Sequence, residues 1–199
     1  MNDKSKRKVN EARGNFLVGN NSNLHKSTGS RLVRKGELIR FSRGIYYSPE
    51  YQKDDFFLLQ SRFSKGIYSF ETALHIHGLL TENKINSMTF PRGYGSKNTL
   101  LKDLNIKAHY SSLKFYDIGL ELKKSSTGKK IKVYDLERSL CDIWHNKSRY
   151  NESYQLELLR LIIKSKEFRI DVLKKYMYLL PISKKLPNII EGIDSSHNF

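Results

Sequence analysis

A short basic segment that ends at a glycine constrains the fold of this chain more than any other feature. Residues 26 to 36 read KSTGSRLVRKG, and their apolar positions recur at the spacing of a helix. Ser27 suits the start of that helix, because its side chain can accept a hydrogen bond from a backbone N–H. Gly36 suits its end, because glycine adopts the left-handed conformation without strain. We therefore expect a helix over about residues 27 to 35.

Two alternating stretches, Leu38 to Phe41 and Ile45 to Tyr47, follow this helix and read as strands. Residues 42 to 44 between them suit a hairpin loop whose glycine takes a positive φ. Ahead of the helix, Lys4 to Arg13 reads as a first helix, and Gly19 to Asn23 is so rich in turn formers that we expect a short or distorted second helix. The order of these elements predicts a winged helix-turn-helix.

Polar and basic side chains remain on the open faces when the apolar residues of the helix turn inward. These are Lys26, Ser27, Thr28, Ser30, Arg31, Arg34, Lys35, Arg40 and Arg43. The major groove of DNA admits an α-helix, and flanking Arg and Lys side chains contact phosphates. We expect Ser30, Arg31 and Arg34 to reach base edges, and Arg40 and Arg43 to contact the backbone. The alternative is that these residues are solvated charges on a small helical domain.

The charge of the whole chain favours a polyanionic partner. Thirty-six Lys and Arg residues stand against 20 Asp and Glu among 199 residues, for a formal net charge of +16. Residues 1 to 50 carry eleven basic and four acidic side chains, so +7, and residues 151 to 199 carry eight and six, so +2. No apolar run approaches the roughly 18 residues needed to span a membrane, and the N-terminal sequence is polar. We therefore expect a cytoplasmic protein that binds double-stranded DNA rather than a membrane.

The rest of the chain predicts a mixed α/β domain, so the fold class expected is α+β. We place the DNA-binding domain at residues 1–48, a linker near Ser48-Pro49-Glu50, and the C-terminal domain at residues 53–199. The elements expected after the linker are helices at Asp54 to Phe63, Ser69 to His77, Asp135 to Trp144, Glu152 to Lys164, Phe168 to Tyr178 and Ile182 to Ile190, and strands at Ser87 to Phe90, Ile106 to Tyr110, Leu120 to Lys124 and Lys130 to Tyr134.

Signals of catalysis or of a bound cofactor are weak. Cys141 is the single cysteine and lies on an apolar helical face, where we expect a buried small residue rather than a nucleophile. His75 and His77 point in different directions on a helix, and no neighbouring cluster supplies further zinc ligands. There is no Walker loop, GxSxG elbow or Rossmann glycine pattern. We therefore expect no cofactor, no metal and no enzymatic activity.

One alternative from the enzyme class rests on Glu121-Leu122-Lys123. A carboxylate, a spacer and a lysine on a strand, with Asp103 or Asp117 upstream, would suit a metal-dependent nuclease of a defence system. With so many acidic and lysine residues, chance alone yields about two such triplets, so the match carries little weight.

Four lysines gather around the turn that we expect near residues 125 to 129. They are Lys123, Lys124, Lys129 and Lys130. A DNA phosphate contact and a solvated face account for them about equally well.

Five segments of the chain resemble, in order, the AbiEi family of antitoxins and transcriptional regulators from bacterial abortive-infection modules. They are RLVRKGELIRFSRGIY (Arg31 to Tyr46), FFLLQ (Phe56 to Gln60), GIYSFETALHIHGL (Gly66 to Leu79), MTFPRGY (Met88 to Tyr94) and KVYDLERSLCDI (Lys132 to Ile143). The resemblance covers about residues 4 to 180. It implies an N-terminal winged helix-turn-helix followed by a C-terminal α/β domain.

The resemblance also implies a function in phage defence. A protein of this family represses its own toxin–antitoxin operon by binding inverted repeats in the promoter. It also counteracts a nucleotidyltransferase toxin of the AbiEii type without a stable antitoxin–toxin complex. The chain shows no sustained heptad and no long apolar terminal helix, so we expect a monomer in solution that binds cooperatively on DNA.

Overall fold

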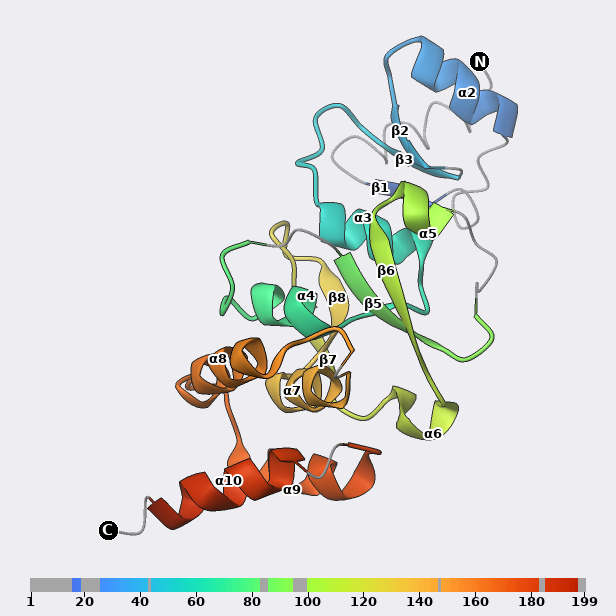
Figure 1. Ribbon diagram of the computed structural model, residues 1–199. Helices are drawn as coiled ribbons and strands as arrows, with labels where there is room; N and C mark the ends of the chain where they lie inside the picture. Colours follow the sequence, from blue (N-terminus) through green and yellow to red (C-terminus); the bar gives the residue numbers. More distant parts are fainter. Residues whose placement is uncertain are drawn as a thin grey trace. The chain divides into compact units, whose positions relative to one another are not determined.

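A computed structural model describes residues 16–18, 26–42, 44–82, 86–94, 100–146, 148–182 and 185–196. The chain is a mixed α+β protein, as the sequence predicted. Its contacts divide it into two compact units, one of residues 1–64 and 124–131 and the other of residues 65–123 and 132–199 (Figure 1). The expected domain limits, 1–48 and 53–199, stay a prediction.

The first unit contains the helix and the hairpin that the sequence predicted. Helix α2 (Lys26–Arg34) is followed by β2 (Ile39–Ser42) and β3 (Ile45–Tyr47), and β3 pairs antiparallel with both β2 and β1 (Phe16–Val18). Gly36 and Gly44 have φ angles of 71° and 81°, so both occupy the left-handed conformation expected of them.

The hairpin loop is shorter than the sequence predicted. Ser42 belongs to β2 and pairs with Ile45, with a register shift between Arg40 and Ser42. This bulge accommodates the extra residue that the sequence placed in the loop. Arg43, the first predicted helix at residues 4–13 and the turn-rich segment at 19–23 lie outside the described residues, so the complete winged helix-turn-helix stays a prediction.

Helix α2 packs on the hairpin through one glycine. Leu32, Leu38 and Tyr46 form a small buried cluster, with Val33 packed against it. A Cβ atom on Gly29 would lie 2.8 Å from a carbon of the Tyr46 ring and 2.9 Å from its hydroxyl oxygen. Only glycine therefore lets the helix backbone approach the tyrosine this closely.

The first unit also holds α3 (Asp55–Arg62) and a hairpin tip at residues 124–131. Asp54 caps α3 by accepting a hydrogen bond from the backbone N–H of Phe57 at 3.0 Å, as the acidic first turn of the predicted helix suggested. The other oxygen of this buried carboxylate accepts from the hydroxyls of Ser125 and Thr127. Asp54 therefore joins the start of α3 to the tip of the hairpin.

The second unit is built on a mixed sheet with the strand order β6-β5-β4-β8-β7. Its strands are β4 (Ile67–Tyr68), β5 (Asn86–Pro91), β6 (Ile106–Ser111), β7 (Leu120–Lys124) and β8 (Lys130–Tyr134). Strand β5 runs parallel to β6 and antiparallel to β4, while β4 runs parallel to β8. The central strands are anchored by large apolar side chains that are fully buried, namely Ile67 and Tyr68 in β4, Met88 and Phe90 in β5, and Ile131, Val133 and Tyr134 in β8.

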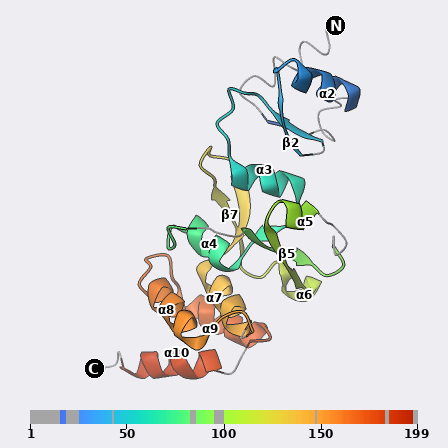
Figure 2. The same cartoon turned by 45° about the horizontal axis from the view of Figure 1, so that its top comes forward.

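The helices of the second unit pack on the sheet or on one another. They are α4 (Phe70–Ile76), α5 (Leu100–Asp103), α6 (Leu113–Tyr116), α7 (Leu136–His145), α8 (Glu152–Ile163), α9 (Ile170–Leu179) and α10 (Lys185–Ser196). Both views show α7 to α10 assembled on the side of the sheet where α4 lies (Figures 1 and 2). Helix α7 contacts α4, α8 and α9, so its buried Leu140, Ile143 and Trp144 form the centre of the core.

Most elements of the second unit agree with the sequence prediction. The hairpin strands β7 and β8 have the predicted limits, and Asp135 caps α7 by accepting from the backbone N–H of Arg138. The prediction missed β4, α5 and α6, which are only two to four residues long, and it ended α10 too early. Among the described residues, no helix is both long and apolar enough to cross a membrane.

We predict that Gly29→Ala destabilises the first unit. Alanine favours a helix over glycine by about 1 kcal/mol, but its Cβ would overlap the Tyr46 ring, at a cost of about 1 to 3 kcal/mol. Faster amide hydrogen exchange in α2 would report the change. Gly192→Ala in α10 is the matched control, because no atom lies within 4 Å of the added Cβ. Unchanged exchange in the Gly29 variant would contradict the predicted overlap.

Candidate nucleic-acid interface

Helix α2 has one buried face and one polar face. At 100° per residue, Gly29, Leu32 and Val33 point to one side, and these are the residues that pack on the hairpin. Ser27, Ser30, Arg31 and Arg34 recur at spacings of three and four and therefore lie on the opposite side. The residues predicted to reach base edges, Ser30, Arg31 and Arg34, thus share the face that points away from the hairpin.

The open face of α2 is positive. The helix contains no acidic residue in its first turn, and Arg31 and Arg34 lie in its last turn. Arg34, Lys35 and Arg40 are exposed, whereas Thr28, Ser30 and Arg31 are partly exposed. Lys26 begins the helix, and Arg43 lies outside the described residues. Within the part of the chain that the structure describes, no carboxylate forms an ion pair with Arg31, Arg34 or Arg40.

Three of the four predicted hairpin lysines are exposed. Lys124, Lys129 and Lys130 lie at or beside the tip that belongs to the same unit as α2. Lys123 differs, because its ammonium lies 2.7 Å from a carboxylate oxygen of Glu167. A DNA contact by Lys123 would have to compete with this ion pair, and the contact of each of the four lysines with DNA stays a prediction.

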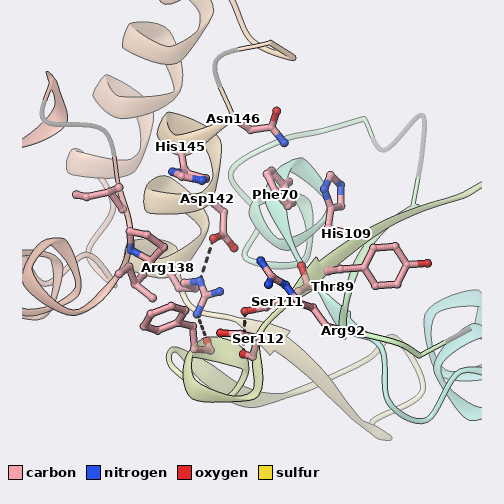
Figure 3. A pocket seen from close by; sticks show the side chains of 15 residues that line it. Phe70, Thr89, Arg92, His109, Ser111, Ser112, Arg138, Asp142, His145 and Asn146 are labelled. Carbon is pink, nitrogen blue, oxygen red and sulfur yellow. Dashed lines mark hydrogen bonds and ion pairs between the residues drawn. The ribbon is translucent and has the colours of Figure 1, made fainter. Parts of the chain in front are cut away.

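The second unit contains a pocket of about 450 Å³ at one edge of its sheet (Figure 3). It lies beside the ends of β5 and β6, the polar side of α7 and the segment after α9. Phe70 and His109 stack on one side, with ring centroids 3.9 Å apart, and Arg138 and Asp142 lie together on another. The sequence had assigned none of these residues to a site.

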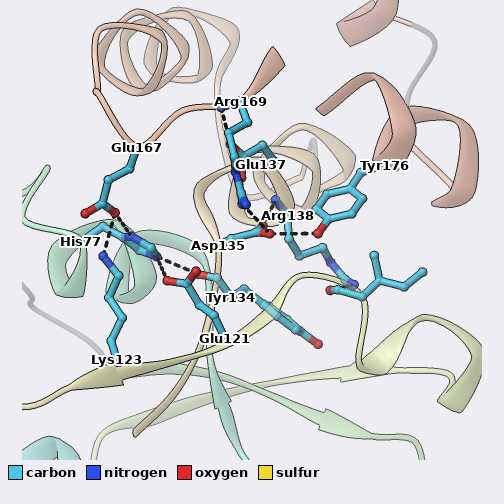
Figure 4. A network of polar contacts seen from close by, with 11 residues as sticks. His77, Glu121, Lys123, Tyr134, Asp135, Glu137, Arg138, Glu167, Arg169 and Tyr176 are labelled. Atoms are coloured by element: carbon cyan, nitrogen blue, oxygen red, sulfur yellow. Dashed lines mark hydrogen bonds and ion pairs between the residues drawn. The ribbon is translucent and has the colours of Figure 1, made fainter. Parts of the chain in front are cut away.

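A second cluster surrounds His77 at the edge of β7 (Figure 4). The Nδ1 atom of His77 lies 3.0 Å from Glu167, and Nε2 lies 3.0 Å from the carbonyl oxygen of Tyr134 and 3.4 Å from Glu121. Hydrogen bonds from Lys123 and His77 hold the pKa of Glu167 below its ordinary value. Lys123 is therefore paired with Glu167, whereas Glu121 lies near His77 and its buried Oε1 has no hydrogen-bond partner.

A neighbouring set of polar contacts holds α9 against the start of α7. Arg169 donates from its guanidinium to Glu137 at 3.0 Å and to Asp135 at 3.3 Å, and its backbone N–H also donates to Glu137. The hydroxyl of Tyr176 donates to Asp135 at 2.9 Å. The carboxylate of Glu137 is fully buried, so these donors offset the cost of burying its charge (Figure 4).

Among the described residues, the acidic residues that the nuclease alternative invokes do not gather around Glu121. No group of three or more His, Cys, Asp or Glu residues able to hold a metal ion occurs among the described residues. Asp103 and Asp117 are exposed and do not line the pocket that contains Glu121. A nuclease of the expected type needs carboxylates that converge on a cation, and here Glu121 faces a histidine instead.

Cys141 and His75 have structural roles, as the sequence predicted. Cys141 is fully buried, and burial raises the pKa of its thiol far above the ordinary value, which opposes formation of a reactive thiolate. His75 Nδ1 lies 2.8 Å from the carbonyl oxygen of Leu80, so it closes the turn after α4.

Sequence reasoning missed the pocket residues for two different reasons. Arg138 and Asp142 are opposite charges four residues apart on a helix with a strongly apolar face, and this was a readable sign of an ion pair. Arg92 follows β5 and His109 lies in β6, and nothing in the local sequence predicts that β5 and β6 end side by side. Their proximity is a product of the tertiary structure.

We predict that Asp135 makes the second unit more stable at mildly acidic pH. Burial raises the pKa of Asp135 from 3.8 to about 6, so the folded state binds the proton more tightly than the unfolded state. The contribution of Asp135 to the free energy of unfolding is fully present below pH 3.8 and is lost as the pH rises through about 6. It should amount to roughly 1 to 3 kcal/mol.

Asp135→Asn keeps a residue that can cap α7 and removes the titrating group. The fluorescence of Trp144, the single tryptophan, can follow urea unfolding at pH 7 and pH 4.5. The free energy of unfolding of the wild type should rise relative to that of the variant on acidification, since all other titrations are shared. A difference that stays constant or falls would contradict the prediction.

Comparison with known proteins identifies the fold alone. No family model matches the chain, and no curated protein matches it. The chain is similar in structure to the RV2827C protein from Mycobacterium tuberculosis, with a TM-score of 0.61 and 13% sequence identity. The match covers 91% of this chain and 73% of that protein. The two proteins therefore share an architecture, at an identity too low to carry function from one to the other.

Proposed function

We propose that this protein is a non-enzymatic, sequence-specific DNA-binding protein that represses transcription of its own toxin–antitoxin operon. The observation that carries the proposal is the open face of α2, where Ser30, Arg31 and Arg34 lie together opposite the buried face. A short helix with polar and guanidinium groups on its outer face has the dimensions and chemistry that the major groove accepts.

The hairpin after α2 supports the same proposal. Arg40 is exposed on β2, and Arg43 precedes the left-handed Gly44 in the loop sequence. In a winged helix-turn-helix these two arginines would reach the phosphates beside the groove that α2 enters. Lys124, Lys129 and Lys130 belong to the same unit and would add further phosphate contacts.

The antitoxin part of the proposal rests on the resemblance to the AbiEi family. The protein would bind inverted repeats as two cooperating monomers and protect cells from a nucleotidyltransferase toxin without forming a stable complex with it. The large second unit would supply that protection, and the first unit would supply operator recognition. Neither step requires a cofactor or a metal.

We predict that Arg31→Ala and Arg34→Ala each weaken operator binding selectively. An arginine that makes a bidentate contact with guanine contributes about 1 to 3 kcal/mol of discrimination, so affinity for random DNA should change much less. Arg40→Ala is the matched control, because it should weaken operator and random DNA alike. Fluorescence anisotropy with a duplex from upstream of the gene, over a range of salt concentrations, measures both effects.

A footprint on the same duplex should reveal protected inverted repeats. The assigned roles would be reversed if Arg31→Ala and Arg34→Ala weakened both duplexes equally while Arg40→Ala changed the sequence preference. Absence of any protected sequence would exclude the repressor proposal itself.

The nuclease alternative makes the opposite prediction about Glu121. A nuclease centred on Glu121 and Lys123 should cleave a plasmid with magnesium or manganese and lose that activity on Glu121→Ala. We expect no cleavage, and we expect Glu121→Ala to protect cells when the toxin is expressed from an unrelated promoter. Leu122→Ala, at the exposed spacer of the triplet on β7, is the control. A folded Glu121→Ala protein that failed to protect would favour the enzyme.

A further inference from the structure

The pocket between the ends of β5 and β6 and helix α7 has the size of a small-molecule site. Its volume is about 450 Å³, within the range of roughly 300 to 1,000 Å³ that ligand pockets occupy. Strands β5 and β6 are parallel and in register to their last residues, where Pro91 pairs with Ser111. Ligands of α/β sheets commonly bind at the carboxyl ends of parallel strands, because polar residues can follow each strand there.

One side of the pocket is suited to an anion. Arg92 follows β5, and its backbone N–H donates to the carbonyl oxygen of Ser111 at 2.9 Å, so the two strand ends are fixed together. Ser111 and Ser112 also line the pocket and carry hydroxyls. Arg92 is exposed, and within the described part of the chain no carboxylate forms an ion pair with it. A phosphate would supply the negatively charged partner that this guanidinium lacks.

His109 adds a neutral hydrogen-bond donor of fixed tautomer. A guanidinium nitrogen of Arg149 lies 2.8 Å from His109 Nε2, and since a guanidinium can only donate, Nε2 must accept. Burial, together with the nearby charges of Arg149 and Lys107, lowers the pKa of His109 to about 3. The ring is therefore neutral at physiological pH, and its proton is on Nδ1.

The wall behind His109 holds a strained residue. Phe70, which stacks on His109, has a φ of 54°, a left-handed backbone conformation that an aromatic residue adopts at a cost of about 1 to 2 kcal/mol. Its ring is buried between His109 and Tyr150, with the guanidinium of Arg149 above its face. Such strain persists where the surrounding packing fixes it, and it is concentrated at binding sites.

The opposite side of the pocket offers an unsatisfied acceptor. Arg138 Nε donates to Asp142 Oδ1 at 3.0 Å, whereas Asp142 Oδ2 is buried without a hydrogen-bond partner. A buried carboxylate oxygen without a donor is costly and calls for one. A neutral donor suits this oxygen best, because Arg138 already provides the positive charge beside Asp142. An amino group on a ring meets this requirement, whereas the ammonium group of an amino acid does not.

Apolar side chains complete the pocket between these two sides. Phe115, Leu180, Pro181 and Ile182 line it and offer a surface for a planar ring. We propose that the pocket binds a nucleotide whose base carries an exocyclic amino group, with the phosphate on Arg92 and the amino group directed to Asp142. The proposal concerns the second unit only and does not depend on DNA binding by α2.

Isothermal titration calorimetry on the full chain tests the proposal with AMP, CMP and GMP. At least one of them should bind, and its counterpart without the amino group should bind about tenfold more weakly or worse; the counterparts are purine riboside 5′-monophosphate for AMP, UMP for CMP and IMP for GMP. Inorganic phosphate alone should bind weakly. No binding of the three nucleotides at millimolar concentration overturns the proposal, as does equal binding of the counterparts that lack the amino group.

Two variants locate the site. Arg92→Ala removes an exposed side chain and should weaken binding about tenfold, whereas Arg160→Ala, an exposed arginine on α8 away from the pocket, should leave it unchanged. Asp142→Asn can still accept from Arg138 and turns the unsatisfied acceptor into a donor, so the preference for an amino-bearing base should disappear. A tight nucleotide complex that both Arg92→Ala and Asp142→Asn leave intact would place binding elsewhere and overturn the proposal.

The ligand could be a free nucleotide or the end of a nucleic-acid chain. A short single strand that ends in the preferred nucleotide distinguishes the two. Tighter binding of the strand than of the free nucleotide would identify a chain end as the ligand, and weaker binding would identify the free nucleotide. Either result supports the proposed pocket chemistry only if Arg92→Ala abolishes the difference in affinity between the strand and the free nucleotide.

Discussion

The buried guanidinium of Arg138 is the interaction on which most of the second unit depends. It forms an ion pair with Asp142, donates to the carbonyl oxygens of Phe115 and Ile118, and lies 4.4 Å from the centre of the Tyr134 ring. A charge with this little exposure is tolerated only when such partners surround it. Gly119 lies so close to the same helix that it must be a glycine, since a Cβ there would lie 2.4 Å from Arg138 Cβ. The end of α6, the strand β8 and the central helix α7 are therefore positioned by one side chain, which also forms a wall of the pocket.

The elements that local sequence could predict are those with strong local signals. Helix α7 begins at Asp135 because the aspartate caps it, and the turn between β7 and β8 closes through Ser125, Lys129 and Gly128. The short strand β4 carries no such signal. It has two residues and exists because β5 and β8 lie on either side of it. Residues distant in the sequence make it a strand, and the β-propensity of its two residues could not predict those neighbours.

The candidate sites follow the same division. The open face of α2 could be predicted because helical spacing determines which side chains point away from Leu32. The pocket could not, because it joins the ends of two strands, a helix and the segment after α9. The hypothesis that Glu121 and Lys123 form a catalytic pair depended only on their spacing along one strand. That spacing gives no information about His77 and Glu167, which lie beside them and come from other elements. The function of a motif on a strand therefore depends on the residues that contact it from other elements.

The charge on α2 is an arrangement that folding alone does not explain. A helix of nine residues is marginal by itself, so α2 depends on the contact of Gly29 and Leu32 with the hairpin. Its outer face contributes little to that contact and could carry any polar residue. Arg31 instead lies three and four residues from Arg34 and Lys35, where like charges repel and weaken a helix by a few tenths of a kcal/mol. No acidic residue in the helix relieves this repulsion, and a polyanion bound along that face would. This repulsion supports the polyanionic partner that we propose for that face of α2.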